Sequence, residues 1–176
     1  SRPPPKVPPE LAKIAELEDR RSLGPEGALG NWARTHPDPT VRIRALLALG
    51  RIQDPETIDT VLNALTDEYP AVRAEAAFAA SLLGLSWQKL SDAQKAKLGE
   101  ALIGFETVEP EPAVKLALID ALARVGSLAT AERLVELLAV PGEVQARAAL
   151  ALGVAARQLA PAQLPARAIP ALSALS

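Results

Sequence analysis

The sequence predicts an all-α protein, an open α-solenoid (superhelix) in which antiparallel helix pairs stack side by side. The first observation is composition: 49% of the 176 residues are apolar, mostly Ala, Leu and Val, and aromatic residues make up only 3%. Small, helix-favouring residues indicate closely packed helices, and the aromatic and β-branched runs typical of a sheet are missing. The second observation is internal repetition. A repeated helix pair cannot bury its apolar face alone, so it stacks on its neighbours.

Four stretches of the chain repeat one pattern, in which a Pro or Gly stands shortly before a Val. These valines are Val41, Val72, Val114 and Val144, spaced 31, 42 and 30 residues apart. Small or apolar residues recur four, seven and eight positions after each Val. Ala45, Ala48 and Leu49 occupy these positions after Val41. This spacing is typical of a helix with one buried face.

In order along the chain, the pattern predicts a unit of helix, turn and helix. Helices with the repeated Val cover residues 38–52, 69–84, 111–126 and 141–156, and their companion helices cover residues 24–36, 55–65, 91–105 and 128–138. Pro55 after Asp54, and Ser91, are typical of helix starts, whereas Gly84 and Gly126 are typical of helix ends. The longest unit has its extra residues around positions 85–97.

The two ends of the chain differ from the repeats. Residues 1–10 contain five prolines, which favours a stiff, extended spacer, and residues 11–176 form the predicted helical repeat domain. An amphipathic segment that begins at Pro9 and includes Leu11, Ile14 and Leu17 is expected to cap the first repeat. Residues 161–176 resemble the start of another repeat without any acidic residue. We therefore expect the natural protein to continue beyond Ser176, or a partner to cover this end.

The stretch "DPTVRIRALLALG" and its copies resemble HEAT repeats over roughly residues 24–160. They are most similar to the short bacterial variety related to phycobilisome lyase subunits. Armadillo repeats would be longer and would show a third helix. The segment "IAELEDRRSLG" ahead of the repeats resembles bacterial envelope proteins whose HEAT region precedes a cyclophilin-type prolyl isomerase domain. None of that catalytic domain is present in these 176 residues.

The sequence contains no Met, not even at position 1, and this bears on localisation together with the resemblance. A proline-rich start without Met is similar to the region behind a removed secretion signal or lipid anchor, although an arbitrary chain boundary would look the same. Localisation stays open, with the bacterial envelope or periplasm favoured over the cytoplasm. No apolar run approaches the length of a membrane span.

A basic or polar residue follows each repeated Val: Arg42, Arg73, Lys115 and Gln145. The HEAT resemblance implies that these residues form a ladder between repeats, and Asp38, Asp67 and Glu111 are candidate partners. Arg44 and Arg147 lie two positions further on, where they are either solvated or part of a binding face.

Structural roles are expected for the other conspicuous residues. His36 is expected to cap a helix or lie on the surface, and core packing is the default for Trp32. For Trp87, packing under a loop is favoured over an interaction anchor. The acidic turn of residues 106–112 is expected to be a solvated connector. HEAT relatives with a di-iron centre carry repeated His-Glu pairs, and this sequence has none.

The sequence thus favours a non-catalytic scaffold that binds a partner protein or an adjacent domain of the same chain. Candidate partner-binding residues are Arg44, Trp87, Arg147 and Arg73. No catalytic residue, metal or cofactor is expected. One alternative is an accessory region of a bacterial multidomain enzyme of the prolyl isomerase or bilin lyase type. Another, a nucleic-acid-binding solenoid, is disfavoured by the net charge of −2 and the pI near 5.5. The sequence names no partner and leaves the oligomeric state open.

Overall fold

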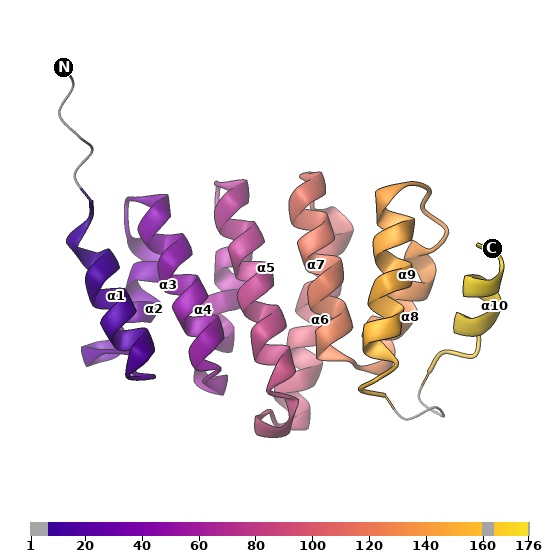
Figure 1. The fold of residues 1–176 in the computed structure, drawn as a ribbon, viewed down its shortest axis with the longest axis horizontal. Coiled ribbons are helices and arrows are strands. Elements are labelled where there is room, and N and C mark those ends of the chain that lie inside the picture. The colour runs from indigo at the N-terminus through magenta and orange to yellow at the C-terminus, as the bar shows by residue number, and fades with distance from the viewer. Residues whose placement is uncertain (1–6, 160–163, 176) are drawn as a thin grey trace, which may run out of the picture.

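A computed structural model describes residues 7–159 and 164–175, and its helices form two stacked rows (Figure 1). The front row consists of α1 (Pro9–Asp19), α3 (Pro39–Ile52), α5 (Pro70–Leu85), α7 (Pro112–Val125) and α9 (Glu143–Ala155). The back row consists of α2 (Ala28–Thr35), α4 (Ile58–Asn63), α6 (Asp92–Val108) and α8 (Leu128–Leu137). A last helix, α10 (Ala168–Ser173), packs against α8. The described residues contain no strand, and the predicted all-α solenoid is confirmed.

Short 3₁₀ turns join or extend several of these helices: η1 (Pro25–Gly27), η2 (Pro55–Thr57), η3 (Ala64–Thr66) and η4 (Trp87–Lys89). The extra residues of the longest unit form η4 and the start of α6, which makes α6 the 17-residue helix of the back row.

Local chemistry explains where the helices begin. Front-row helices α3, α5 and α7 start with Pro, whose missing N–H costs nothing at the first helical position. In the back row, the hydroxyl groups of Ser91 and Ser127 accept hydrogen bonds from backbone N–H groups of the first turn of α6 and α8.

One predicted helix end is correct and another is wrong. Gly126 ends α7 in the left-handed conformation, with φ of 59°. Gly84 instead lies inside α5, which continues to Leu85. A Cβ at Gly84 would lie 3.0 Å from the backbone of Arg124, so this glycine permits a close approach of α5 to α7.

The core runs continuously between the two rows. Residues four, seven and eight positions after each repeated Val are all buried, as the pattern predicts: Ala45, Ala48, Leu49, Ala76, Ala79, Ala80, Leu118, Ala121, Leu122, Ala148, Ala151 and Leu152. Small residues at these sites let successive front-row helices approach closely, and a Cβ at Gly50 would lie only 2.8 Å from Cα of Ala79.

The N-terminal cap forms as expected. Helix α1 packs against α3 and buries Ile14 and Leu17. Because α1 begins at Pro9, residues 9–10 of the predicted spacer are helical, and residues 1–6 lie outside the described part of the chain. Of the C-terminal segment 161–176, only residues 164–175 are described.

Candidate functional site

The first two basic residues after the repeated valines form the rungs of a ladder between repeats. Arg42 donates two hydrogen bonds to the Asp67 carboxylate, with N–O distances of 2.8 and 3.0 Å, and a third to the His36 carbonyl at 2.7 Å. The Asp67 carboxylate also accepts the N–H of Tyr69, at the start of α5. Arg42 therefore ties α3 to the turn that begins the next front-row helix.

Arg73 repeats this arrangement one unit further on. Its guanidinium donates to both oxygens of Glu109 at 3.0 and 2.8 Å and to the Asp67 carbonyl at 2.9 Å. The hydrogen bond from Arg73 lowers the pKa of Glu109 below its usual value. Because its guanidinium group is already bound within the fold, Arg73 is less available to a partner protein than the sequence suggested. Its proposed role in partner binding remains a prediction.

The partners of the ladder are only partly those that the sequence suggested. Asp67 is a partner, as expected, whereas Glu109 stands where Glu111 was expected. Asp38 caps its own helix by accepting the N–H of Thr40 at 2.8 Å. The geometric reason is that Asp67 and Glu109 each accept the backbone N–H of the residue two positions later, just before the next front-row helix. A carboxylate held there can bind the arginine at the same time.

The last two rungs are weaker. The ammonium group of Lys115 lies 3.3 Å from Glu106, and the Gln145 amide donates to the Leu138 carbonyl at 2.6 Å. Gln145 is uncharged, so the ladder loses its ionic character towards the C-terminal end.

The acidic stretch 106–112 is not the solvated connector that we expected. Glu106 is completely buried in α6, and its carboxylate accepts a hydrogen bond from Arg133 of α8 at 2.7 Å. Glu109 belongs to the ladder. Local sequence gives no signal for Glu106, because its partner Arg133 lies 27 residues further along the chain.

Arg44 lies in a cluster of four charges on the front row, together with Glu18, Arg51 and Glu75. Both Arg44 and Arg51 form ion pairs with Glu18 of α1. Burial raises the pKa of the Glu75 carboxyl group, and the two arginines act in the opposite direction. The side chain of Arg44 is 27% exposed, so this arginine is only partly available to a partner.

Arg147 lies at the seam between α7 and α9. It forms an ion pair with Asp120 at 2.9 Å, in which both side chains are more than 40% exposed. A cavity of about 250 Å³ beside this pair is also lined by Arg124, Leu150 and Val154. Arg124 has no carboxylate partner among the described residues and donates to the hydroxyl group of Ser81 at 3.1 Å.

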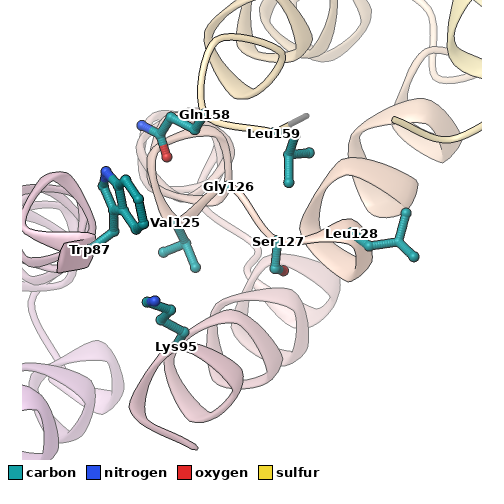
Figure 2. Close-up of a pocket in the computed structure, with 8 residues that line it drawn as sticks. All are labelled: Trp87, Lys95, Val125, Gly126, Ser127, Leu128, Gln158 and Leu159. Atoms are coloured by element: carbon teal, nitrogen blue, oxygen red, sulfur yellow. The ribbon is translucent and has the colours of Figure 1, made fainter. Parts of the chain in front are cut away.

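Trp87 does not fill a gap between repeats. It remains 46% exposed and lines a cavity of about 310 Å³. Figure 2 shows the indole and the Lys95 side chain entering this space from two different helix ends, with Val125 between them. The Lys95 ammonium group lies 5.2 Å from the centre of the indole ring, a cation–π contact. Trp32, by contrast, packs against the core as expected.

His36 has the capping role that the sequence predicts. Its Nδ1 accepts a hydrogen bond from the N–H of Asp38 at 3.1 Å, and its Nε2 lies 3.8 Å from Glu10 of α1. The part of the chain that the structure describes contains no cluster of three His, Cys, Asp or Glu side chains suited to a metal ion.

A strip of surface residues that the sequence reading missed runs across the front row. It consists of the residues two and six positions after each repeated Val, which point away from the back row because they lie opposite the buried stripe. None of these residues is buried: Ile43, Leu47, Ala74, Phe78, Leu116, Asp120, Ala146 and Leu150. We call this set the front strip. All but Asp120 are apolar; Ile43, Ala74 and Leu116 still pack against the core, whereas Phe78, Ala146 and Leu150 are exposed. The recurrence of apolar residues opposite the buried stripe is the sequence signal that could have revealed the strip.

Residues 27–103 match the family model of HEAT repeats. The matched segment includes both arginine rungs, Arg42 and Arg73, and the first half of the front strip. A search of curated proteins found no match to the chain. In the described residues, no helix has the length and apolar character needed to cross a membrane.

Proposed function

We propose that this chain is a protein-binding scaffold whose HEAT-like repeats offer the front strip to an acidic, partly apolar segment of a partner protein. The observation that carries this proposal is the strip itself. Phe78 is 42% exposed and Leu150 is 71% exposed, and they lie at the same repeat position on α5 and α9. Large apolar side chains that gather on one face of a folded protein are typical of interaction surfaces.

The charges beside the strip favour an acidic partner. Arg44, Arg51, Arg124 and Arg147 flank it, whereas Glu18, Glu75 and Asp120 are the carboxylates that face them. Arg124 is not neutralised by any carboxylate in the described chain. The whole protein carries a net charge of −2, so the positive charge beside the strip is a local feature. Such complementarity sets partner choice and the rate of association more than affinity.

Rigidity also supports a scaffold. Bidentate arginine–carboxylate rungs fix successive front-row helices relative to one another, so the strip keeps its shape before a partner arrives. A preformed surface spends less free energy on ordering when it binds. A neighbouring domain of a multidomain enzyme would meet the same preformed surface as a separate partner protein. The finer assignments to prolyl isomerase or bilin lyase systems remain predictions.

A comparison of three proteins tests the proposal: the wild type, a front-strip variant (Phe78→Ser, Leu150→Ser, Arg147→Glu) and a matched control. The control changes two exposed apolar residues and one exposed base elsewhere (Val108→Ser, Val140→Ser, Lys97→Glu). Each immobilised protein is incubated with extract of the source cell, and bound proteins are crosslinked and identified by mass spectrometry.

We expect the wild type and the control to retain the same partners, through crosslinked segments that contain Asp or Glu next to apolar residues. The front-strip variant should lose them, and retention should weaken as salt rises. An unchanged set of partners with the front-strip variant would refute the assignment of this surface. Salt-sensitive binding of DNA or RNA by the wild type, lost with the same variant, would instead support the nucleic-acid alternative.

A further inference from the structure

The cavity beside Trp87 has features that the front strip lacks. Its wall is built from several separate elements, namely η4, α6, the end of α7, the start of α8 and the segment after α9. Its volume of about 310 Å³ falls at the small end of the range of ligand-binding clefts. It lies at the C-terminal ends of α5 and α7, where Figure 2 shows Trp87, Lys95 and Val125 around it. The front strip runs instead across the outer side of the front row.

Among the described residues that line this cavity, Lys95 is the only charged one. Its one ion pair is with Asp92, at 3.5 Å, and the Asp92 side chain is fully exposed to water. An exposed pair of this kind contributes little, so the ammonium group remains available to another anion. None of the described lining residues has an acidic side chain.

Trp87 supplies an apolar surface next to that cation. Its indole is half exposed, and the indole N–H donates to no group among the described residues. Lys95 Nζ lies 5.2 Å from the ring centre, so a ligand that touches both needs an anionic and an apolar group only a few ångströms apart. Exposed tryptophans beside a cation are the kind of anchor around which binding energy concentrates.

The remaining walls are fixed by contacts within the fold. Gly126 has a left-handed backbone, and a Cβ there would collide with the side chain of Gln158, which packs directly over it. The Ser127 hydroxyl group accepts the N–H of Thr130 at the start of α8 and donates to the Thr130 hydroxyl group, and is therefore occupied. Recognition of a ligand thus falls to Trp87, Lys95 and the Gln158 amide.

From these features we infer that the cavity binds the C-terminal residue of a partner peptide, with the terminal carboxylate on Lys95 and an apolar side chain against Trp87. A C-terminal apolar residue carries both groups on one Cα, which matches the short distance between the ammonium group and the indole. An internal Asp or Glu would have to bring its apolar group from a different residue. This inference goes beyond the front strip and does not depend on it.

The indole N–H signals in a ¹⁵N–¹H NMR spectrum test the inference directly. The chain has two such signals, and that of Trp87 is identified by its disappearance in Trp87→Phe. The Trp32 signal, from a side chain packed against the core, reports whether each variant stays folded. The probes are three short peptides: acetyl-Gly-Gly-Leu with a free C-terminus, the same peptide as its C-terminal amide, and acetyl-Gly-Glu-Gly-amide.

We expect the free-acid peptide to shift the Trp87 signal in a saturable manner and to leave the Trp32 signal in place. The amide should bind about tenfold more weakly, because it lacks the charge-assisted contact with Lys95. Lys95→Gln should weaken binding of the free acid by a similar factor. Lys97→Gln, on the same helix but outside the cavity, is the matched control and should bind like the wild type.

Three outcomes would overturn the inference. They are no shift of the Trp87 signal with the free-acid peptide at millimolar concentration, equal affinity for the free-acid peptide and its amide, and equal affinity for the free-acid peptide and acetyl-Gly-Glu-Gly-amide. Because none of the substitutions touches the front strip, such a result would leave the proposed scaffold function unaffected.

Discussion

At the scale of single residues, the repeated arginine is the feature on which the array depends most directly. Arg42 is 7% exposed and donates to a carboxylate and to the turn before its own helix at once. Position in the repeat indicated this role, because the residue after each repeated Val is basic in three of four copies and polar in the fourth. The sequence did not predict which carboxylate pairs with each arginine, since Arg73 binds Glu109 rather than Glu111.

The Arg42→Ala variant should lower the free energy of unfolding by on the order of 1–3 kcal/mol, because it removes the buried guanidinium that Asp67 and the His36 carbonyl bind. Urea denaturation followed by circular dichroism measures this change. Arg51→Ala is the matched control, since the Arg51 side chain is 55% exposed, and should cost less than about 1 kcal/mol. Equal losses in the two variants would contradict a special role for the ladder.

Glu75 should act against stability at neutral pH. Its pKa is raised by burial, and its Oε1 is buried without a hydrogen-bond partner in the described structure. A folded-state pKa above the unfolded value means that the folded form holds the proton more tightly. The stability that this proton confers is complete below the usual carboxyl pKa and is lost as pH rises through the folded-state value.

Glu75→Gln is therefore expected to raise the melting temperature at pH 7, and the gain should shrink as pH falls towards 4, near the usual glutamate pKa. Glu109→Gln provides the opposite case, because Arg73 lowers the pKa of Glu109. Its carboxylate stabilises the fold above the usual pKa, so this variant should lower the melting temperature at neutral pH and approach the wild type in acid. Thermal melts across this pH range measure both changes, and a Glu75→Gln variant that loses stability at pH 7 would refute the first.

At the scale of elements, the role of each glycine depends on the helix that packs beside it. Gly84 has the appearance of a helix end in the sequence, yet it lies inside α5 and faces the backbone of Arg124. Gly50 and Gly153 occupy the same repeat position, nine residues after Val41 and Val144. Gly50 packs against Ala79, whereas Gly153 has nothing within 4 Å of a Cβ.

These two glycines should respond to alanine in opposite ways. Gly50→Ala should destabilise the protein by about 1–3 kcal/mol, since its Cβ would push α3 and α5 apart. Gly153→Ala should stabilise it by about 0.5–1 kcal/mol, because alanine favours the helix and meets no neighbour. Urea denaturation of the two variants decides the matter. A loss of stability in Gly153→Ala would show that another group packs on this face of α9.

At the scale of the whole molecule, the two rows divide their tasks. The buried stripe between them holds the stack together, and the opposite side of the front row carries the front strip, in which Phe78 and Leu150 are exposed. Flanking arginines are partly neutralised near α1, α3 and α5 by Glu18 and Glu75. Towards α7 and α9, Arg124 lacks such a partner. The proposed docking of an acidic segment should therefore be anchored at the α7–α9 side.

The sequence by itself determined the all-α class, the helix pairs, the positions of the buried stripe and the cap of the first repeat. These features depend on local periodicity and on helix-start chemistry, which a few neighbouring residues define. It also identified Arg147 and Trp87 as surface candidates, although it favoured packing for Trp87.

Tertiary structure alone decided the rest. The burial of Glu106, the pairing of Arg73 with Glu109 and the close approach at Gly84 all join residues from different repeats. The cavity of Trp87 and Lys95 exists only because five segments meet near the C-terminal ends of α5 and α7. The physical reason is that the periodicity of apolar residues indicates which face of a helix is buried. It does not indicate which charged group of another repeat lies opposite that helix.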